Sequence, residues 1–195
     1  EALLHKMTTW AQSAMARPDS KTQELIRWLH HTLKPGGVWS NERVILFTEY
    51  RATQNWLQTL LAAAGFTGGG RLRTLYGGMP TAEREAIKTA FLAHPDDSPV
   101  RILLATDAAS EGIDLQRHCH RLIHLEIPWN PNRLEQRNGR IDRHGQRHNP
   151  QIYHFVGQGY QQQLLLAGAR DELDADLEFL LRVAVKVDQI REDLG

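Results

Sequence analysis

The fold is decided by residues 102–114, which read Ile-Leu-Leu-Ala-Thr-Asp-Ala-Ala-Ser-Glu-Gly-Ile-Asp. The first four side chains form an unbroken apolar run, which is typical of a strand covered on both faces in a parallel sheet. Small and polar residues follow at the carboxyl end of this predicted strand, from Thr106 to Asp114. Ligands of open α/β sheets bind at the carboxyl ends of strands. The stretch therefore predicts a buried strand with a candidate site at its end.

Four more apolar runs have the same character, and helix-like stretches separate them. The predicted strands cover residues 44–47, 72–76, 100–105, 121–125 and 151–156. The predicted helices between them cover residues 53–64, 81–93 and 132–143. Strands that alternate with helices over short links predict an α/β fold, and right-handed crossovers then give a doubly wound sheet.

Both ends of the chain also have helical patterns. Residues 20–33 place Leu25, Leu29 and Leu33 at helical spacing, with Asp19 or Ser20 as the N-cap. Near the C-terminus one apolar stripe contains Leu173, Leu177, Leu180, Leu181, Ala184 and Val187. We therefore expect a helical lead-in at 1–34, a central lobe at 35–160 and a helical extension at 161–195.

Length and composition fit a single globular domain of 195 residues, with 41% hydrophobic and 24% charged residues. The formal net charge is zero, which on its own argues against a nucleic-acid-binding surface. That neutrality is an average, however. Residues 117–147 contain seven arginines and three acidic residues, whereas residues 170–195 contain four basic and eight acidic residues. A basic segment that faces phosphates therefore remains compatible with the composition.

Other features bear on the compartment. The apolar runs are shorter than the roughly 18 residues of a membrane-spanning helix, and the N-terminus lacks the pattern of a signal peptide. The single cysteine, Cys119, cannot form an internal disulfide, which fits a reducing compartment. We expect a cytoplasmic protein without a membrane partner. Because the chain starts at Glu1 rather than at Met, we also expect a piece of a longer protein.

A second polar stretch, residues 136–146, reads Gln-Arg-Asn-Gly-Arg-Ile-Asp-Arg-His-Gly-Gln. On a helix, Gln136, Arg140 and Arg143 are spaced i, i+4 and i+7 and share one face. Such a face favours an anion, because a guanidinium donates to two phosphate oxygens at once. Taken alone, the stretch is more simply explained as a solvated basic face paired with Glu135 and Asp142.

The end of the first stretch also has two interpretations. Gly112 allows a ligand to approach the backbone closely, and the Asp114 carboxylate is able to accept a hydrogen bond from a ribose hydroxyl. A capped turn at Thr106 or Asp107 explains the same residues without a ligand. The chain lacks the GxxxxGK[ST] phosphate loop. Its histidines around Cys119 do not follow zinc-ligand spacing, so we expect no metal site.

In this order and spacing, the two stretches resemble motifs of the second RecA-like lobe of superfamily-two helicases, specifically the Swi/Snf-type translocases. Residues 103–116 resemble motif V, and residues 136–146, which end in Arg-x-Gly-Gln, resemble motif VI. Residues 44–50 are similar to motif IV, residues 76–91 to the block that follows it, and residues 19–21 to the Ser-x-Lys helix that precedes the lobe. The resemblance covers residues 20–156 and is closer to bacterial defence-type or polymerase-associated translocases than to nucleosome remodellers.

This resemblance implies a RecA-like parallel sheet with helices on both faces. It implies that Arg140 and Arg143 reach the phosphates of ATP, with Arg143 as the arginine finger, and that Gln136 helps to orient the hydrolytic site. Residues implied to approach the nucleotide are Gly112 and Asp114. Residues implied to contact the nucleic-acid backbone are Thr106, Thr48 and Gly77.

The resemblance further implies a partner lobe. The phosphate loop and the acidic Mg²⁺ site would lie on an N-terminal RecA-like lobe of the same parent protein, so ATP with Mg²⁺ would bind between the lobes. The isolated chain would then be weakly active at most, and the substrate would be DNA in duplex form. Two alternatives stay open: a degenerate lobe that serves as a protein-interaction module, and the lobe of an RNA helicase.

Overall fold

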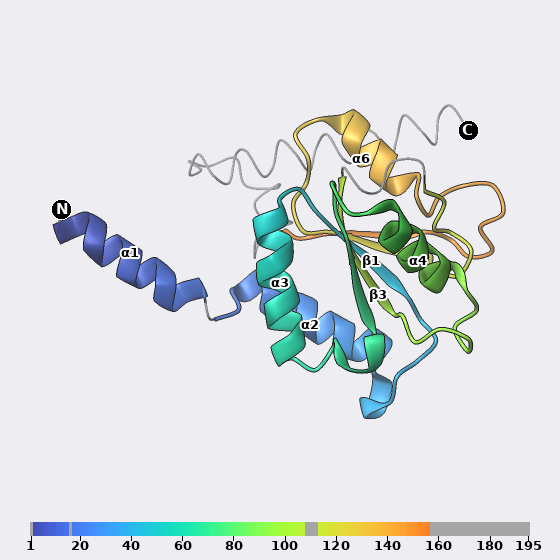
Figure 1. Ribbon diagram of the computed structural model, residues 1–195, viewed down its shortest axis with the longest axis horizontal. Coiled ribbons are helices and arrows are strands. Elements are labelled where there is room, and N and C mark those ends of the chain that lie inside the picture. Colours follow the sequence, from blue (N-terminus) through green and yellow to red (C-terminus); the bar gives the residue numbers. More distant parts are fainter. Residues whose placement is uncertain (1, 16, 108–112, 157–195) are drawn as a thin grey trace, which may run out of the picture.

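The computed structural model describes residues 2–15, 17–107 and 113–156 (Figure 1). Its centre is a five-stranded sheet, and every pair of neighbouring strands is parallel. The strand order is β2-β3-β1-β4-β5. The strands are β1 (Val44–Thr48), β2 (Leu72–Leu75), β3 (Ile102–Thr106), β4 (Arg121–His124) and β5 (Gln151–His154). The predicted parallel α/β sheet is therefore confirmed, with strand ends shifted by one or two residues.

Helices cover both faces of this sheet. The described helices are α1 (Ala2–Met15), which stands apart from the sheet, and α2 (Ser20–Leu33), α3 (Arg51–Ala63), α4 (Thr81–Leu92) and α6 (Pro131–Asn138). Side chains alternate along β1, so Val44 and Leu46 pack with α2 and α3 in one apolar cluster. Ile45 and Phe47 pack with α4 in the other cluster. Figure 1 shows α2 and α3 together on one side of β1 and β3, with α4 on the opposite side.

Helix α2 begins at a capped turn and packs directly against the sheet. The carboxylate of Asp19 accepts a hydrogen bond from the Thr22 amide at 2.7 Å, which selects Asp19 from the two predicted N-caps. Leu25, Leu29 and Leu33 are fully buried. Helix α1 differs, because Trp10 is 73% exposed and lies on a helix that stands apart from the sheet (Figure 1). The predicted C-terminal apolar stripe lies outside the described residues.

Arg43, immediately before β1, closes the carboxyl end of α4. Its side chain is buried, and its Nη1 donates to the carbonyls of Phe91 and Ala93, the latter at 2.7 Å. Its Nε donates to the Val100 carbonyl at 3.1 Å. Burial, helped by nearby Arg101, lowers the pKa of Arg43 to about 10. The guanidinium therefore satisfies carbonyls that the end of a helix leaves without partners.

Cys119 is also buried, just before β4. Its Sγ lies 3.3 Å from the carbonyl of Arg121, and burial raises the pKa of the thiol to about 12. Within the described ranges, no group of three His, Cys, Asp or Glu side chains is arranged to hold a metal ion. Among the same residues, no helix has the length and apolarity needed to cross a membrane.

Candidate functional site

The candidate site lies where the strands end. Because β1, β3 and β4 are parallel, their carboxyl ends meet at one edge of the sheet. Thr48 ends β1, Thr106 ends β3, and Glu126 follows β4. Helix α6 begins beside this edge at an N-cap, where the side chain of Asn130 accepts from the Asn132 amide at 2.9 Å. Pro131 occupies the first turn, where a missing N–H costs nothing.

Helix α6 ends at Asn138, so the prediction of a helix through Arg143 is wrong. The backbone tightens after Gly139: the Arg140 amide donates to the Arg137 carbonyl, three residues back, at 3.0 Å. The prediction that Gln136, Arg140 and Arg143 share one helical face is therefore also wrong. Gln136 and Arg143 are exposed, whereas Arg140 is only 7% exposed.

Tertiary contacts explain why the helix ends before Arg140. The Arg140 carbonyl accepts a hydrogen bond from the Leu115 amide at 2.9 Å, and its Nη1 donates to the Ile113 carbonyl at 3.3 Å. Ile141 enters the same apolar cluster as Ile113 and Leu115. These contacts join residues 113–115 to residues 140–141 and turn the chain out of the helix. The two motif-like stretches are thus packed directly on each other.

Arg143 lies at the surface of this junction. Its side chain is 42% exposed and forms an ion pair with Asp114, whose side chain is 58% exposed. Its Nε donates to the Gly139 carbonyl at 2.7 Å. An exposed ion pair is weak because water screens it. The Arg143 guanidinium is therefore available to exchange Asp114 for another anion, which suits the predicted role. Gly112 lies outside the described residues.

The residues predicted to contact nucleic acid are placed differently. Thr48 and Thr106 are opposite each other in the β1–β3 register, and both side chains are buried. The Thr48 hydroxyl donates to the Glu126 carboxylate at 3.2 Å, and the Glu49 amide donates to the other carboxylate oxygen at 3.3 Å. Gly77, by contrast, is exposed in a turn between β2 and α4. The backbone of Gly77 is open to a ligand, whereas the Thr48 hydroxyl is already engaged.

Sequence reasoning missed Arg137, which the structure places at the centre of the site. Its side chain is 2% exposed and binds both carboxylate oxygens of Asp107, with an Nη2–Oδ2 distance of 2.8 Å. A signal for it was present. Leu134, Arg137 and Ile141 recur at i, i+3 and i+7, so helical spacing places Arg137 on the same side as two apolar residues. All three are buried.

One histidine, His124, lies against this arginine, and a second histidine stacks on the first. His124 on β4 and His154 on β5 are register partners, and their rings stack with centroids 4.7 Å apart. The Nε2 atom of His124 lies 2.9 Å from Oδ1 of Asn138. Burial, together with the charge of Arg137, lowers the pKa of His154 to about 4 and that of His124 well below its usual value. Both rings are therefore neutral at pH 7.

This pair predicts acid sensitivity. Because the pKa of His154 is lower in the folded than in the unfolded chain, the unfolded chain binds more protons between pH 6.5 and about 4. The free energy of unfolding should fall as the pH drops through this window. His154→Gln should make that fall shallower, whereas His5→Gln, on exposed α1, should not change it. Urea titrations at pH 7 and pH 5 measure the free energy of unfolding of each variant at both pH values. If this free energy fell by the same amount in His154→Gln as in the parent, the prediction would be contradicted.

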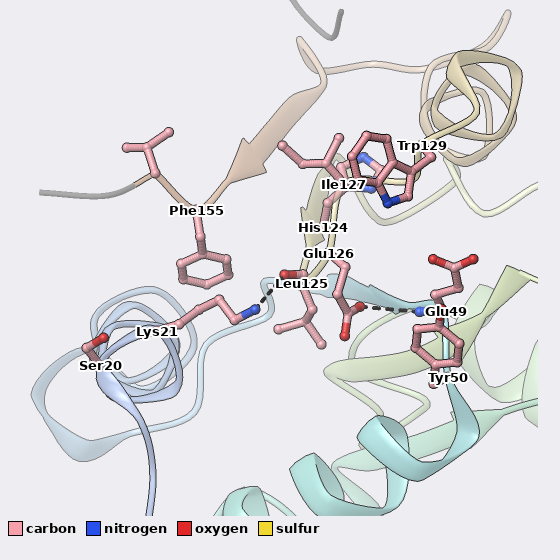
Figure 2. Close-up of a pocket in the computed structure, with 11 residues that line it drawn as sticks. Ser20, Lys21, Glu49, Tyr50, His124, Leu125, Glu126, Ile127, Trp129 and Phe155 are labelled. Atoms are coloured by element: carbon pink, nitrogen blue, oxygen red, sulfur yellow. Dashed lines mark hydrogen bonds between the residues drawn. The ribbon is translucent and has the colours of Figure 1, made fainter. Parts of the chain in front are cut away.

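A cavity of about 510 Å³ adjoins the site, at the carboxyl ends of β1 and β4 (Figure 2). In Figure 2, Lys21 extends from α2 to the Leu125 carbonyl, at 3.0 Å. Tyr50 and Trp129 lie on its rim and are 62% and 61% exposed. Ser20 and Lys21, which belong to the stretch that resembles the Ser-x-Lys helix, thus border the end of β4. The strand order reverses between β1 and β4, which is the usual ligand crevice of an open α/β sheet.

Comparison with protein families identifies the same region. Residues 22–145 match the family model described as helicase conserved C-terminal domain, which covers more than half of the chain. The resemblance predicted from the two stretches is thereby confirmed at the level of this lobe.

Two curated relatives are bacterial. The "Uncharacterized ATP-dependent helicase YqhH" of Bacillus subtilis (strain 168) is 40% identical over 116 residues, which are 60% of this chain and 19% of that protein. The "RNA polymerase-associated protein RapA" of Vibrio vulnificus (strain YJ016) is 28% identical over 169 residues, which are 87% of this chain and 16% of that protein. The chain thus spans less than a fifth of the length of each of these relatives.

Two solved structures share the fold. The C-terminal part of the Fun30 ATPase domain aligns with a TM-score of 0.61 and 18% identity, over 90% of this chain and 55% of that one. The E. coli DEAD-box protein SrmB, solved bound to the regulator RraA, aligns with a TM-score of 0.54 and 23% identity, over 70% of this chain and 69% of that one. At these identities, the likeness extends to the fold alone.

Proposed function

The chain belongs to the family of helicase conserved C-terminal domains, and on that premise we propose that it is the second RecA-like lobe of a Swi/Snf-type, ATP-dependent DNA translocase. One observation carries the proposal. The exposed Arg143 sits on a junction that joins the ends of two motif-like stretches, and its partner is an exposed carboxylate. That arrangement suits an arginine that must exchange one anion for another.

The proposed nucleotide is ATP with Mg²⁺, bound between this chain and an N-terminal RecA-like lobe of the same parent protein. ATP supplies the phosphoryl group whose transfer to water drives the cycle. Arg143 leaves Asp114 and donates to the phosphates as the finger, which frees the Asp114 carboxylate to accept from a ribose hydroxyl. Arg140 is the second proposed phosphate ligand, and it also holds the backbone of this turn through Ile113 and Leu115. Gln136, which is exposed, helps to orient the hydrolytic site, and Gly112 approaches the nucleotide.

The proposed nucleic-acid track follows the ends of β1, β2 and β3. Gly77 contributes its exposed backbone, and Thr106 and Thr48 contribute contacts at the strand ends. Such contacts position a backbone without reading its sequence. The division into 1–34, 35–160 and 161–195 and a cytoplasmic location belong to the same proposal.

The proposal is tested with the parent protein and with this chain alone. ATP hydrolysis by the parent should rise on adding duplex DNA and rise less on adding single-stranded RNA of equal length. The 195-residue chain should show no stimulation, because it lacks the phosphate loop. Stronger stimulation by RNA would identify an RNA helicase lobe. A parent with no stimulated hydrolysis at all would contradict the proposal and favour the alternative of a degenerate lobe.

A further inference from the structure

We propose that Arg137 is a positioning residue, which sets the place of Arg140 and Arg143 according to the state of the strand ends that face nucleic acid. The inference rests on the proposed function, since it concerns the same arginines. Arg137 itself, with its side chain 2% exposed, is held away from solvent and from any nucleotide.

Arg137 forms an ion pair with Asp107 at the end of β3. Asp107 directly follows Thr106 at the end of β3, and Arg137 lies on α6, thirty residues later. Two parallel hydrogen bonds join the guanidinium to both carboxylate oxygens. A bidentate pair fixes direction as well as distance. Any displacement of the end of β3 is therefore transmitted to α6.

Arg137 also contacts the segment that follows β4. The Nη1 atom of Arg137 donates to the Glu126 carbonyl at 3.0 Å. The carboxylate of the same glutamate accepts from the Thr48 hydroxyl at the end of β1. One guanidinium thus joins the ends of β1, β3 and β4. The ring of Phe47 also packs against it, and the guanidinium carbon lies 5.4 Å from the ring centroid. A ligand that displaces Glu126 from Thr48 would disturb this arginine.

Backbone hydrogen bonds connect Arg137 to the residues that follow it in the chain. The Arg137 carbonyl accepts the Arg140 amide at 3.0 Å, and the Asn138 carbonyl accepts the Ile141 amide at 3.1 Å. Only backbone hydrogen bonds separate Arg137 from the turn that carries Arg140, and Gly139, between them, accepts from Arg143. The path therefore runs through rigid groups from the strand ends to both proposed phosphate ligands.

Stability alone gives a poor reason for this pair. Removing two charges from water costs about as much as their attraction returns, and apolar residues of equal volume usually serve as well or better. The neutral His124 beside the guanidinium, at 3.4 Å, offers no compensating charge. A role in positioning accounts for a buried arginine whose donors reach two different strand ends.

The test uses Arg137→Lys in the parent protein, which keeps the positive charge and removes the fork. Nucleic-acid-stimulated kcat should fall by about 10- to 100-fold, as small misplacements of catalytic groups do. KM for ATP and the unstimulated rate should change far less, so the stimulation ratio should fall. The matched control is Arg133→Lys on the same helix. The side chain of Arg133 is 52% exposed, and its Nη1 atom lies 3.8 Å from Oδ2 of Asp107. That control should behave like the parent.

A second variant guards against misfolding. Asp107→Asn keeps the shape of the partner and removes its charge, so it should reduce the stimulation ratio in the same way. The double variant should be no worse than the more impaired single variant, because both remove one interaction. The proposal would be overturned if the double variant lost the product of the two single losses in stimulation ratio. It would also be overturned if Arg137→Lys folded and kept the stimulation ratio of the parent.

An independent readout uses the 195-residue chain alone. Hydrogen exchange of the Leu115 amide, which bonds the Arg140 carbonyl, should be faster in Arg137→Lys and unchanged in Arg133→Lys. Unchanged exchange in Arg137→Lys would refute the positioning role. If the parent shows no stimulated hydrolysis, the proposed function fails, while this exchange measurement still decides whether Arg137 positions the turn.

Discussion

Arg143→Ala in the parent protein is expected to lower kcat for nucleic-acid-stimulated ATP hydrolysis by about 10³-fold or more, since arginine fingers contribute effects of that size. The guanidinium is exposed, and it is held by an exposed carboxylate and one backbone carbonyl. Its removal should therefore leave the fold intact while removing charge stabilisation of the transferred group. Steady-state kinetics with saturating duplex DNA measure the loss, and binding of ATP should weaken far less than kcat falls.

Two variants sharpen this result. Arg147→Ala removes an exposed arginine only four residues away and should stay within about twofold of the parent, because it touches neither Asp114 nor the turn. Asp114→Asn should lose much less than Arg143→Ala, since the arginine keeps its charge. A rate for Arg143→Ala close to that of Arg147→Ala would show that another residue is the finger.

Arg43→Ala in the 195-residue chain is expected to lower the free energy of unfolding by about 3 kcal/mol, because it leaves buried carbonyls without donors and opens a cavity. The carbonyls of Phe91 and Ala93 end α4, and the guanidinium also lies over the Phe91 ring, 5.4 Å from its centroid. Urea unfolding followed by circular dichroism measures the change.

Arg43→Met separates the two causes. Methionine fills most of the space but donates no hydrogen bond, so its loss should lie between that of Arg43→Ala and zero. Arg117→Ala, at an exposed position, serves as the control and should change stability by no more than about 0.5 kcal/mol. If Arg43→Ala were as stable as Arg117→Ala, the interpretation of Arg43 as the closing group of α4 would have to be abandoned.

The strands could be predicted from sequence because burial on both faces leaves a continuous apolar run. Residues 102–105 carry that signal without help from any neighbour. Helix α6 was predicted too long because contacts with residues distant in the sequence determine where it ends. Its end depends on the hydrogen bond from Leu115 to the Arg140 carbonyl, across 25 residues of sequence, and on the entry of Ile141 into the core. Local spacing contains neither contact.

The contacts of the candidate site also join residues that are distant in the sequence, so local patterns could not predict them. The sequence singled out Arg143 and Asp114 in two separate stretches, but it did not predict the ion pair between them. Thr48 was implied by the family resemblance, yet the carboxylate that engages it comes from Glu126, 78 residues later. Arg137 and Asp107 are each ordinary in their local context, and only the parallel order of β1, β3 and β4 brings them together.

Cys119 gives the molecule a practical property. It is the chain's only cysteine, it is buried, and the pKa of its thiol is raised to about 12. Maleimide dyes react with thiolates, so at pH 7 this residue stays unmodified while a newly introduced surface cysteine is labelled. Single-dye derivatives at the exposed positions Ser13 or Gln58 are therefore accessible without first replacing the native cysteine. Paired with a dye on a neighbouring lobe, they would report interdomain distances by energy transfer, in a protein with its native core.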